Sequence, residues 1–89
     1  MATKLIFAVR ENYHSPFETY ESTVWSRAFG RRDEVEHAIR EDALEFDPGF
    51  KDFDDVESPD DEPIAYHYTH SEDDGLEKVW EVVELEVDL

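Results

Sequence analysis

Apolar and polar residues alternate near the start of the chain in a way that predicts two β-strands. In residues 3–13, Leu5, Phe7 and Val9 fall on one side of an extended chain, and the residues between them fall on the other. Residues 20–29 are rich in β-branched and aromatic side chains, and a Ser-Pro pair between the two segments is a turn initiator. The two segments therefore predict a first hairpin.

A helical period follows this hairpin, from about residue 33 to residue 46. Asp33 and Glu36 have the three-residue spacing of a capping box at the start of a helix. The sequence Asp47-Pro48-Gly49 predicts its end, because proline cannot continue a helix and glycine tolerates the turn. Between these signals the apolar residues recur at helical spacing, at Val35, Ala38, Ile39, Ala43 and Phe46.

A second hairpin is predicted at the C-terminal end. Residues 64–70 have the composition of a strand, and residues 71–75 form a tight turn in which Gly75 supplies a positive φ. Residues 76–89 predict a long final strand. Its stretch from Val79 to Val83 is almost continuously apolar, which indicates a central strand packed on both sides.

The order β-β-α-β-β predicts an α+β fold, a four-stranded antiparallel sheet with one helix packed on one face. Eighty-nine residues make a single small domain, residues 1–89. Residues 47–63 contain eight acids, three prolines and no period, so we expect a long acidic loop there. Phe50 and Phe53 in this loop either anchor it on the core or serve as contact aromatics. The strand order does not follow from the pattern.

The net charge of the chain is more informative about its function than any sequence motif. The chain has 25 acidic residues against 8 Lys and Arg, a net charge of -17. Residues 1–40 contain six acids and six bases, so the whole net charge comes from residues 41–89. Phosphate backbones and anionic lipids repel such a charge, so we expect no direct binding to nucleic acid or membranes. The one-sided distribution indicates a basic partner, whereas uniform acidity is typical of salt adaptation.

Three groups of carboxylates form the predicted partner-binding surface: the loop, the turn before the last strand and the end of that strand. At the end of the strand the acids alternate with apolar residues, so they form a column with a spacing of about 6.7 Å, similar to that of phosphates along one nucleic-acid strand. An ordinary solvated strand face is the alternative. The complete predicted set is Asp52, Asp54, Asp55, Glu57, Asp60, Asp61, Glu62, Glu72, Asp73, Asp74, Glu84, Glu86 and Asp88.

The sequence predicts no metal site, no cofactor and no catalytic residue. The Asp-x-Asp start of the loop resembles a calcium-binding loop, but the position that needs glycine is Glu57 and the twelfth position is Pro63. Weak divalent binding by clustered carboxylates is the alternative. His67 and His70 lie on opposite faces of a regular strand, which does not make a zinc site. The chain has no cysteine and no hydrolase or phosphate-loop motif, so we expect no enzyme activity.

In size, acidity and lack of cysteine or catalytic motifs, the chain resembles small phage-encoded anti-defence proteins, including DNA mimics that block restriction enzymes and some anti-CRISPR proteins. These proteins share no single fold, so no residue role follows from the resemblance. It implies an inhibitor that mimics nucleic-acid phosphates and occludes the basic groove of a nucleic-acid-binding protein, in the host cytoplasm if the protein is viral.

Two other functions fit the sequence. One is an accessory or structural domain of a salt-adapted organism, in which acidity serves solubility. The other is a small-ligand or metal-binding module that uses Tyr66, His67, Tyr68 and the acidic loop. The absence of cysteine and of a long apolar run fits a cytoplasmic protein. A homodimer is compatible with the sequence, which does not specify the oligomeric state.

Overall fold

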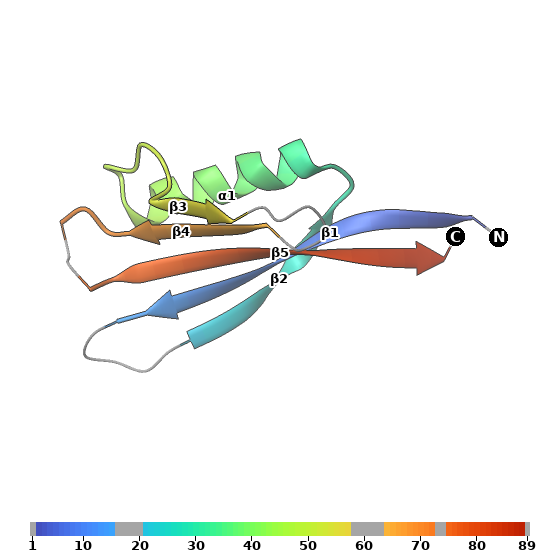
Figure 1. Ribbon diagram of the computed structural model, residues 1–89, viewed down its shortest axis with the longest axis horizontal. Helices are drawn as coiled ribbons and strands as arrows, with labels where there is room; N and C mark the ends of the chain where they lie inside the picture. Colours follow the sequence, from blue (N-terminus) through green and yellow to red (C-terminus); the bar gives the residue numbers. More distant parts are fainter. Residues whose placement is uncertain (1, 16–20, 58–63, 73–74, 89) are drawn as a thin grey trace.

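The computed structural model describes residues 2–15, 21–57, 64–72 and 75–88. Along the chain the elements are β1 (Thr3–His14), β2 (Glu21–Phe29), α1 (Arg32–Phe46), β3 (Asp55–Glu57), β4 (Ala65–Thr69) and β5 (Glu77–Asp88). The strands form one antiparallel sheet in the order β2-β1-β5-β4-β3, and α1 crosses one face of it (Figure 1). The predicted α+β class is therefore confirmed, but the predicted number of strands is wrong because the sheet has five.

The fifth strand lies inside the segment that was predicted to be a loop. In β3, Asp55 pairs with His67, Val56 with Tyr66 and Glu57 with Ala65. Three residues are too few for an alternation to be recognised, and Asp and Glu are depleted in strands. β3 forms because its backbone groups pair with those of β4, and its own sequence does not predict a strand. Residues 58–63 of the predicted loop lie outside the described part of the chain.

The ends of α1 match the prediction except at the cap. The helix begins at Arg32 and its N-cap is Arg31, which makes no side-chain capping bond, so the predicted capping box at Asp33 and Glu36 is wrong. Asp33 instead lies in the first turn, where a negative charge favours the positive end of the helix dipole. The predicted stop is confirmed: the Asp47 N–H donates to the Ala43 carbonyl at 2.8 Å, and the helix goes no further.

The core lies between α1 and the face of the sheet that α1 covers. The helix contributes a buried stripe, and β1, β4 and β5 contribute alternate residues, as the period of two in a strand requires. Tyr66 and Tyr68 of β4 are among the buried residues of this face. The buried apolar side chains are Phe7, Val9, Phe29, Val35, Ile39, Ala43, Phe50, Tyr66, Tyr68, Trp80 and Val82.

Two phenylalanines hold the segment between α1 and β3 on this core. The ring of Phe50 lies 5.0 Å from that of Tyr68, and the ring of Phe53 lies 4.8 Å from that of Tyr66 and 5.8 Å from that of Trp80, between centroids. Of the two alternatives given for Phe50 and Phe53, the structure therefore supports the one in which they anchor the loop on the core. It also brings the acidic segment around them against the β4 side of the sheet.

The other face of the sheet has no covering element within the described ranges. Trp80 and Val82 of β5 point toward α1 and are buried, whereas Val79, Glu81 and Val83 point away from it and are only partly buried. The prediction that this stretch is packed on both sides is therefore wrong. The neighbouring strands β1 and β4, and not a second layer, give these residues their partial cover.

Beyond the helix, β1 and β5 continue as a two-stranded arm (Figure 1). Pairing in the arm runs from Ile6 opposite Leu85 to Thr3 opposite Asp88. Apolar side chains at its surface, such as Leu85, remain about half exposed. The arm makes the molecule long, with extents of 50 × 26 × 23 Å.

Candidate functional site

The predicted partner-binding carboxylates fall into two groups at opposite ends of β5. Glu72 lies in the turn before β5, and Asp88 ends it, so a strand of 12 residues, roughly 37 Å from first to last, separates them. The segment that contains Asp52 and Asp54 lies with Glu72 near the β4 edge of the sheet, as does β3. The structure thus does not unite the three predicted groups on one compact surface. Outside the described residues are Asp60, Asp61, Glu62, Asp73 and Asp74.

Glu84, Glu86 and Asp88 share one side of β5. The register places them opposite Phe7, Leu5 and Thr3, and all three carboxylates are exposed. Glu84 forms an ion pair with Arg32 from the start of α1. Within the described part of the chain, Glu86 and Asp88 have no ion-pair partner, so two of the three charges are available to another molecule.

Two carboxylates of the other group bond within the fold. Asp54 accepts a hydrogen bond of 2.6 Å from the backbone N–H of Thr69, at the end of β4. Asp52 lies 3.4 Å from the guanidinium of Arg40 and accepts a bond of 2.9 Å from the N–H of Phe53. These two residues therefore help to position the segment before β3.

Most basic side chains are neutralised inside the molecule. Within the described ranges, five of the eight Lys and Arg residues form ion pairs with acids, and the guanidinium of Arg27 lies over the ring of Phe29 at 4.6 Å. The exposed carboxylates therefore dominate the field around the protein. The paired bases and their acids are Arg10 with Glu81, Arg31 with Asp33, Arg32 with Glu84, Arg40 with Glu36 and Asp52, and Lys78 with Glu11 and Asp42.

This excess of like charge predicts that salt stabilises the fold. Raising NaCl from 0.02 M to 0.5 M shortens the screening length severalfold and weakens carboxylate repulsion more than it weakens the few ion pairs. We expect the midpoint of thermal unfolding, followed by circular dichroism, to rise by about 5 °C, which corresponds to roughly 1 kcal/mol for a domain of this size. Choline chloride should act like NaCl. A midpoint that falls with salt would show that the ion pairs outweigh the repulsion.

A partly buried group of one lysine and two carboxylates joins α1 to the middle of the sheet. The Nζ of Lys78 lies 2.7 Å from Oδ2 of Asp42 and 3.0 Å from Oε2 of Glu11. Burial lowers the pKa of Lys78, but the hydrogen bonds to Asp42 and Glu11 outweigh burial, so the pKa is raised. Asp42 also accepts a bond of 2.8 Å from the indole Nε1 of Trp80. These contacts join the helix to β1 and β5 and therefore serve the fold.

A hollow of about 540 Å³ lies between β2 and α1. The side of the hollow formed by β2 includes Trp25, Phe29 and Arg27, whose guanidinium lies over the ring of Phe29. The helix brings Glu41, Asp42 and Glu45 to the other side. An apolar surface beside carboxylates suits the aliphatic stem and charged head of a lysine or arginine. This site could not be predicted from the sequence, because it depends on which side of α1 faces β2.

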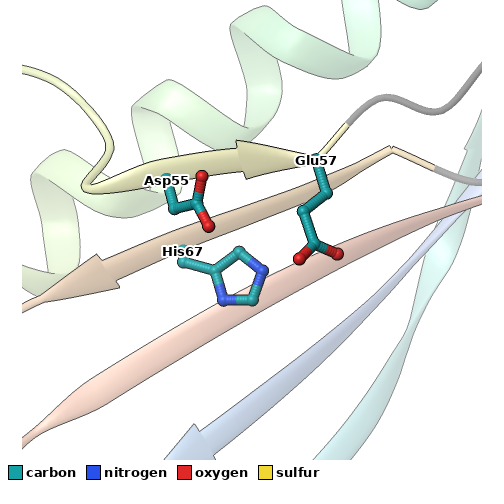
Figure 2. A group of neighbouring side chains, drawn as sticks. All are labelled: Asp55, Glu57 and His67. Atoms are coloured by element: carbon teal, nitrogen blue, oxygen red, sulfur yellow. The ribbon is translucent and has the colours of Figure 1, made fainter.

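Two carboxylates and an imidazole meet at the β3–β4 edge, on the face that α1 leaves open (Figure 2). Asp55 and Glu57 are alternate residues of β3, so they share a face, and His67 of β4 lies directly opposite Asp55. One potential ligand atom from each residue lies within 4.8 Å of the others. Figure 2 shows the imidazole between the two carboxylates. The sequence did not predict this group, because β3 lies in the segment that was predicted to be a loop.

Comparisons with protein-family models, curated proteins and solved structures find no match to this chain. Its function must therefore be argued from its own residues. No helix in the described ranges combines the length and apolar character that crossing a membrane requires.

Proposed function

We propose that this protein binds the basic nucleic-acid-binding surface of another protein and occludes it, with carboxylates in place of phosphates. The observation that carries the proposal is the linear density of charge. Seventeen net negative charges over a length of 50 Å amount to one charge per about 3 Å. A single nucleic-acid strand has one per about 3.4 Å, and a duplex has one per about 1.7 Å. The mean net charge per unit length of the protein is thus close to that of a nucleic-acid strand.

The arm presents an exposed part of this charge. Glu86 and Asp88 are two residues apart on a paired strand, which sets them at about 6.7 Å and limits their freedom. Carboxylates held in this way lose little entropy when they bind arginine or lysine, and charge-assisted hydrogen bonds to such groups are strong. The field of the whole molecule also accelerates encounter with a positive surface.

The hollow between β2 and α1 supports the same class of partner. A basic side chain that enters it can lay its stem on Trp25 and its charge near Glu41 or Glu45. A protein partner with protruding basic side chains can make this contact, whereas a simple counter-ion cannot. It also adds apolar contact area to an interface that otherwise depends on charge.

The test compares a double charge reversal with a matched control. In Glu86→Lys with Asp88→Lys, two exposed carboxylates on the arm change sign. The control is Glu21→Lys with Glu34→Lys, which makes the same change of charge at exposed positions in the half of the chain without net charge. Glu36 is unsuitable for the control because it pairs with Arg40. Each protein is immobilised and used to capture partners from lysate at about 0.1 M salt.

We expect the wild type and the control to capture a basic nucleic-acid-binding protein that added duplex DNA or higher salt displaces. The arm variant should bind the purified partner at least about tenfold more weakly, which is about 1.4 kcal/mol, since each reversal replaces an attraction by a repulsion. Binding that DNA does not displace would exclude mimicry. Equal loss in both variants would exclude the arm as the contact. A chain that folds only at molar salt and captures nothing would favour salt adaptation.

A further inference from the structure

We propose that Asp55, Glu57 and His67 bind one divalent transition-metal ion of the zinc class, with two carboxylate oxygens and one imidazole nitrogen as ligands. The site lies on the open face of the sheet, at its β3 edge (Figure 2). It is distinct from the arm and from the hollow beside α1. Its existence does not depend on any protein partner.

The backbone, and not only the side-chain rotamers, brings the three ligands together. Asp55 and His67 are directly paired across β3 and β4, where Cβ atoms are about 4.5–5.5 Å apart. Glu57 is the diagonal neighbour of His67, and its longer side chain can cover that greater separation. Small rotations about side-chain bonds close the observed separations, of up to 4.8 Å, to those of ligands around one ion. Sites on paired strands are held more precisely than sites on loops.

The hydrogen bonding around the three side chains is incomplete. The Nε2 atom of His67 is buried and has no hydrogen-bond partner among the residues that the structure describes. A buried polar atom without a partner loses its hydration at a cost of about 1–3 kcal/mol. The carboxylates of Asp55 and Glu57 likewise have no hydrogen-bond or ion-pair partner within the described ranges, although these two like charges share one side of a short strand. A cation between them would satisfy the nitrogen and relieve the repulsion.

The donor set indicates the class of ion. Calcium and magnesium prefer sites made of oxygen alone, whereas zinc and its neighbours take imidazole together with carboxylate. Zinc binds such groups at about 2.0–2.2 Å and keeps a water or another ligand where the protein supplies only three. Because Asp55 and Glu57 are exposed, this further position faces solvent.

An acidic edge strand also has another use, since charges on an edge discourage pairing with a second chain. Such protection requires no particular side chain opposite the acids. A metal site, in contrast, requires His67. The test therefore replaces one acid and one histidine together in each variant.

The probe is ZnCl₂, titrated calorimetrically into the full chain at 0.15 M NaCl with millimolar Mg²⁺ to occupy diffuse acidic positions. The site variant is Asp55→Asn with His67→Gln. The matched control is Glu86→Gln with His37→Gln, which removes the same charge and the same ring from exposed positions elsewhere. Nitrogen-15 spectra of the wild-type histidines, recorded during the same titration, report which imidazole binds and need no variant.

We expect one zinc ion per chain, a shift of the His67 side-chain nitrogens and at least tenfold weaker binding in the site variant, with the control like the wild type. Equal affinities for zinc in both variants would overturn the proposal, and so would a titration in which His67 does not respond. Protection of the sheet edge would then remain as the role of Asp55 and Glu57. Since no partner protein takes part, these results are independent of the capture experiment.

Discussion

Replacement of Asp47 by alanine is expected to lower the midpoint of thermal unfolding by about 10 °C. The Asp47 carboxylate is 2 % exposed. It accepts hydrogen bonds from the hydroxyls of Tyr68, at 2.6 Å, and Ser71, at 2.7 Å, and from the N–H groups of Ser71 and Gly49, both at 2.9 Å. Alanine leaves these donors without an acceptor in a partly closed site, which costs far more than the loss of a satisfied pair.

Thermal unfolding at pH 7 measures this effect, with Asp52→Ala as the control. Asp52 is a carboxylate of the same segment, but it is exposed, and among the described residues its partners are Arg40 and the N–H of Phe53. Its removal should shift the midpoint by no more than about 2 °C. If both variants shift alike, Asp47 has no special role in joining the end of α1 to the β4–β5 turn.

The same residue gives the stability a dependence on acid. Hydrogen bonds from Tyr68, and then from Ser71, hold the pKa of Asp47 well below its ordinary value of about 3.9, whereas burial acts in the opposite direction. A lowered pKa in the folded state contributes stability that is fully present above the unfolded pKa. That contribution is lost as the pH falls from about 4 toward the folded pKa.

The difference between the wild type and Asp47→Asn should therefore be largest above pH 5 and should shrink below pH 4. Comparing the two proteins at each pH cancels the protonation of the other acids, which both share. Midpoints of unfolding between pH 2.5 and 7 provide the measurement. A difference that stays constant across this range would mean that the Asp47 charge contributes nothing.

The second large effect is expected for Trp80→Ala, at about 3–5 kcal/mol. Trp80 is fully buried in the middle strand of the sheet, under α1, and the ring of Phe53 lies 5.8 Å from its own. Alanine removes the largest side chain of the core and leaves the carboxylate of Asp42 without the indole donor. Small domains have only about 5–15 kcal/mol in total, so the variant should be substantially unfolded at low salt.

Urea denaturation measures the change, with Val24→Ala as the control because Val24 is 64 % exposed on β2. The control should change the free energy of unfolding by less than about 0.5 kcal/mol. Trp80→Phe keeps most of the ring area and should fall between the two. A loss below about 1 kcal/mol for Trp80→Ala would mean that α1 and the sheet close over the gap.

The sequence predicts the parts of this fold that have long, regular patterns. The alternation of Leu5, Phe7 and Val9, the helical spacing up to Phe46 and the positive φ at Gly75, which is 103°, all appear in the structure. These features depend on local periods and on single-residue conformations, which a sequence displays directly. The predicted capping box is wrong because its first acid, Asp33, lies two residues beyond the N-cap, inside the first turn of the helix.

The surface arrangement depends on register, and the sequence did not reveal it. Asp55, Glu57 and His67 meet only because β3 pairs with β4, and three residues give no pattern from which to infer this. The acids of residues 41–89 look like one group in the sequence, but β5 carries Asp88 to the end of the molecule far from Glu72. Closeness along the chain is thus a poor guide to closeness on a sheet whose last strand spans its length.

The position of β5 also bears on how the chain folds. It is the last strand in the sequence and the middle strand of the sheet, and it contributes Trp80 and Val82 to the core. Its partner in the centre is β1, so contacts such as that between Arg10 and Glu81 close a loop of 71 residues. Pairing across so long a separation is slow, because the entropy of closure is lost before the contacts form. The β1–β2 hairpin and α1 therefore have no complete core to pack against until the final strand arrives, and a nascent chain on the ribosome cannot finish folding before β5 has emerged.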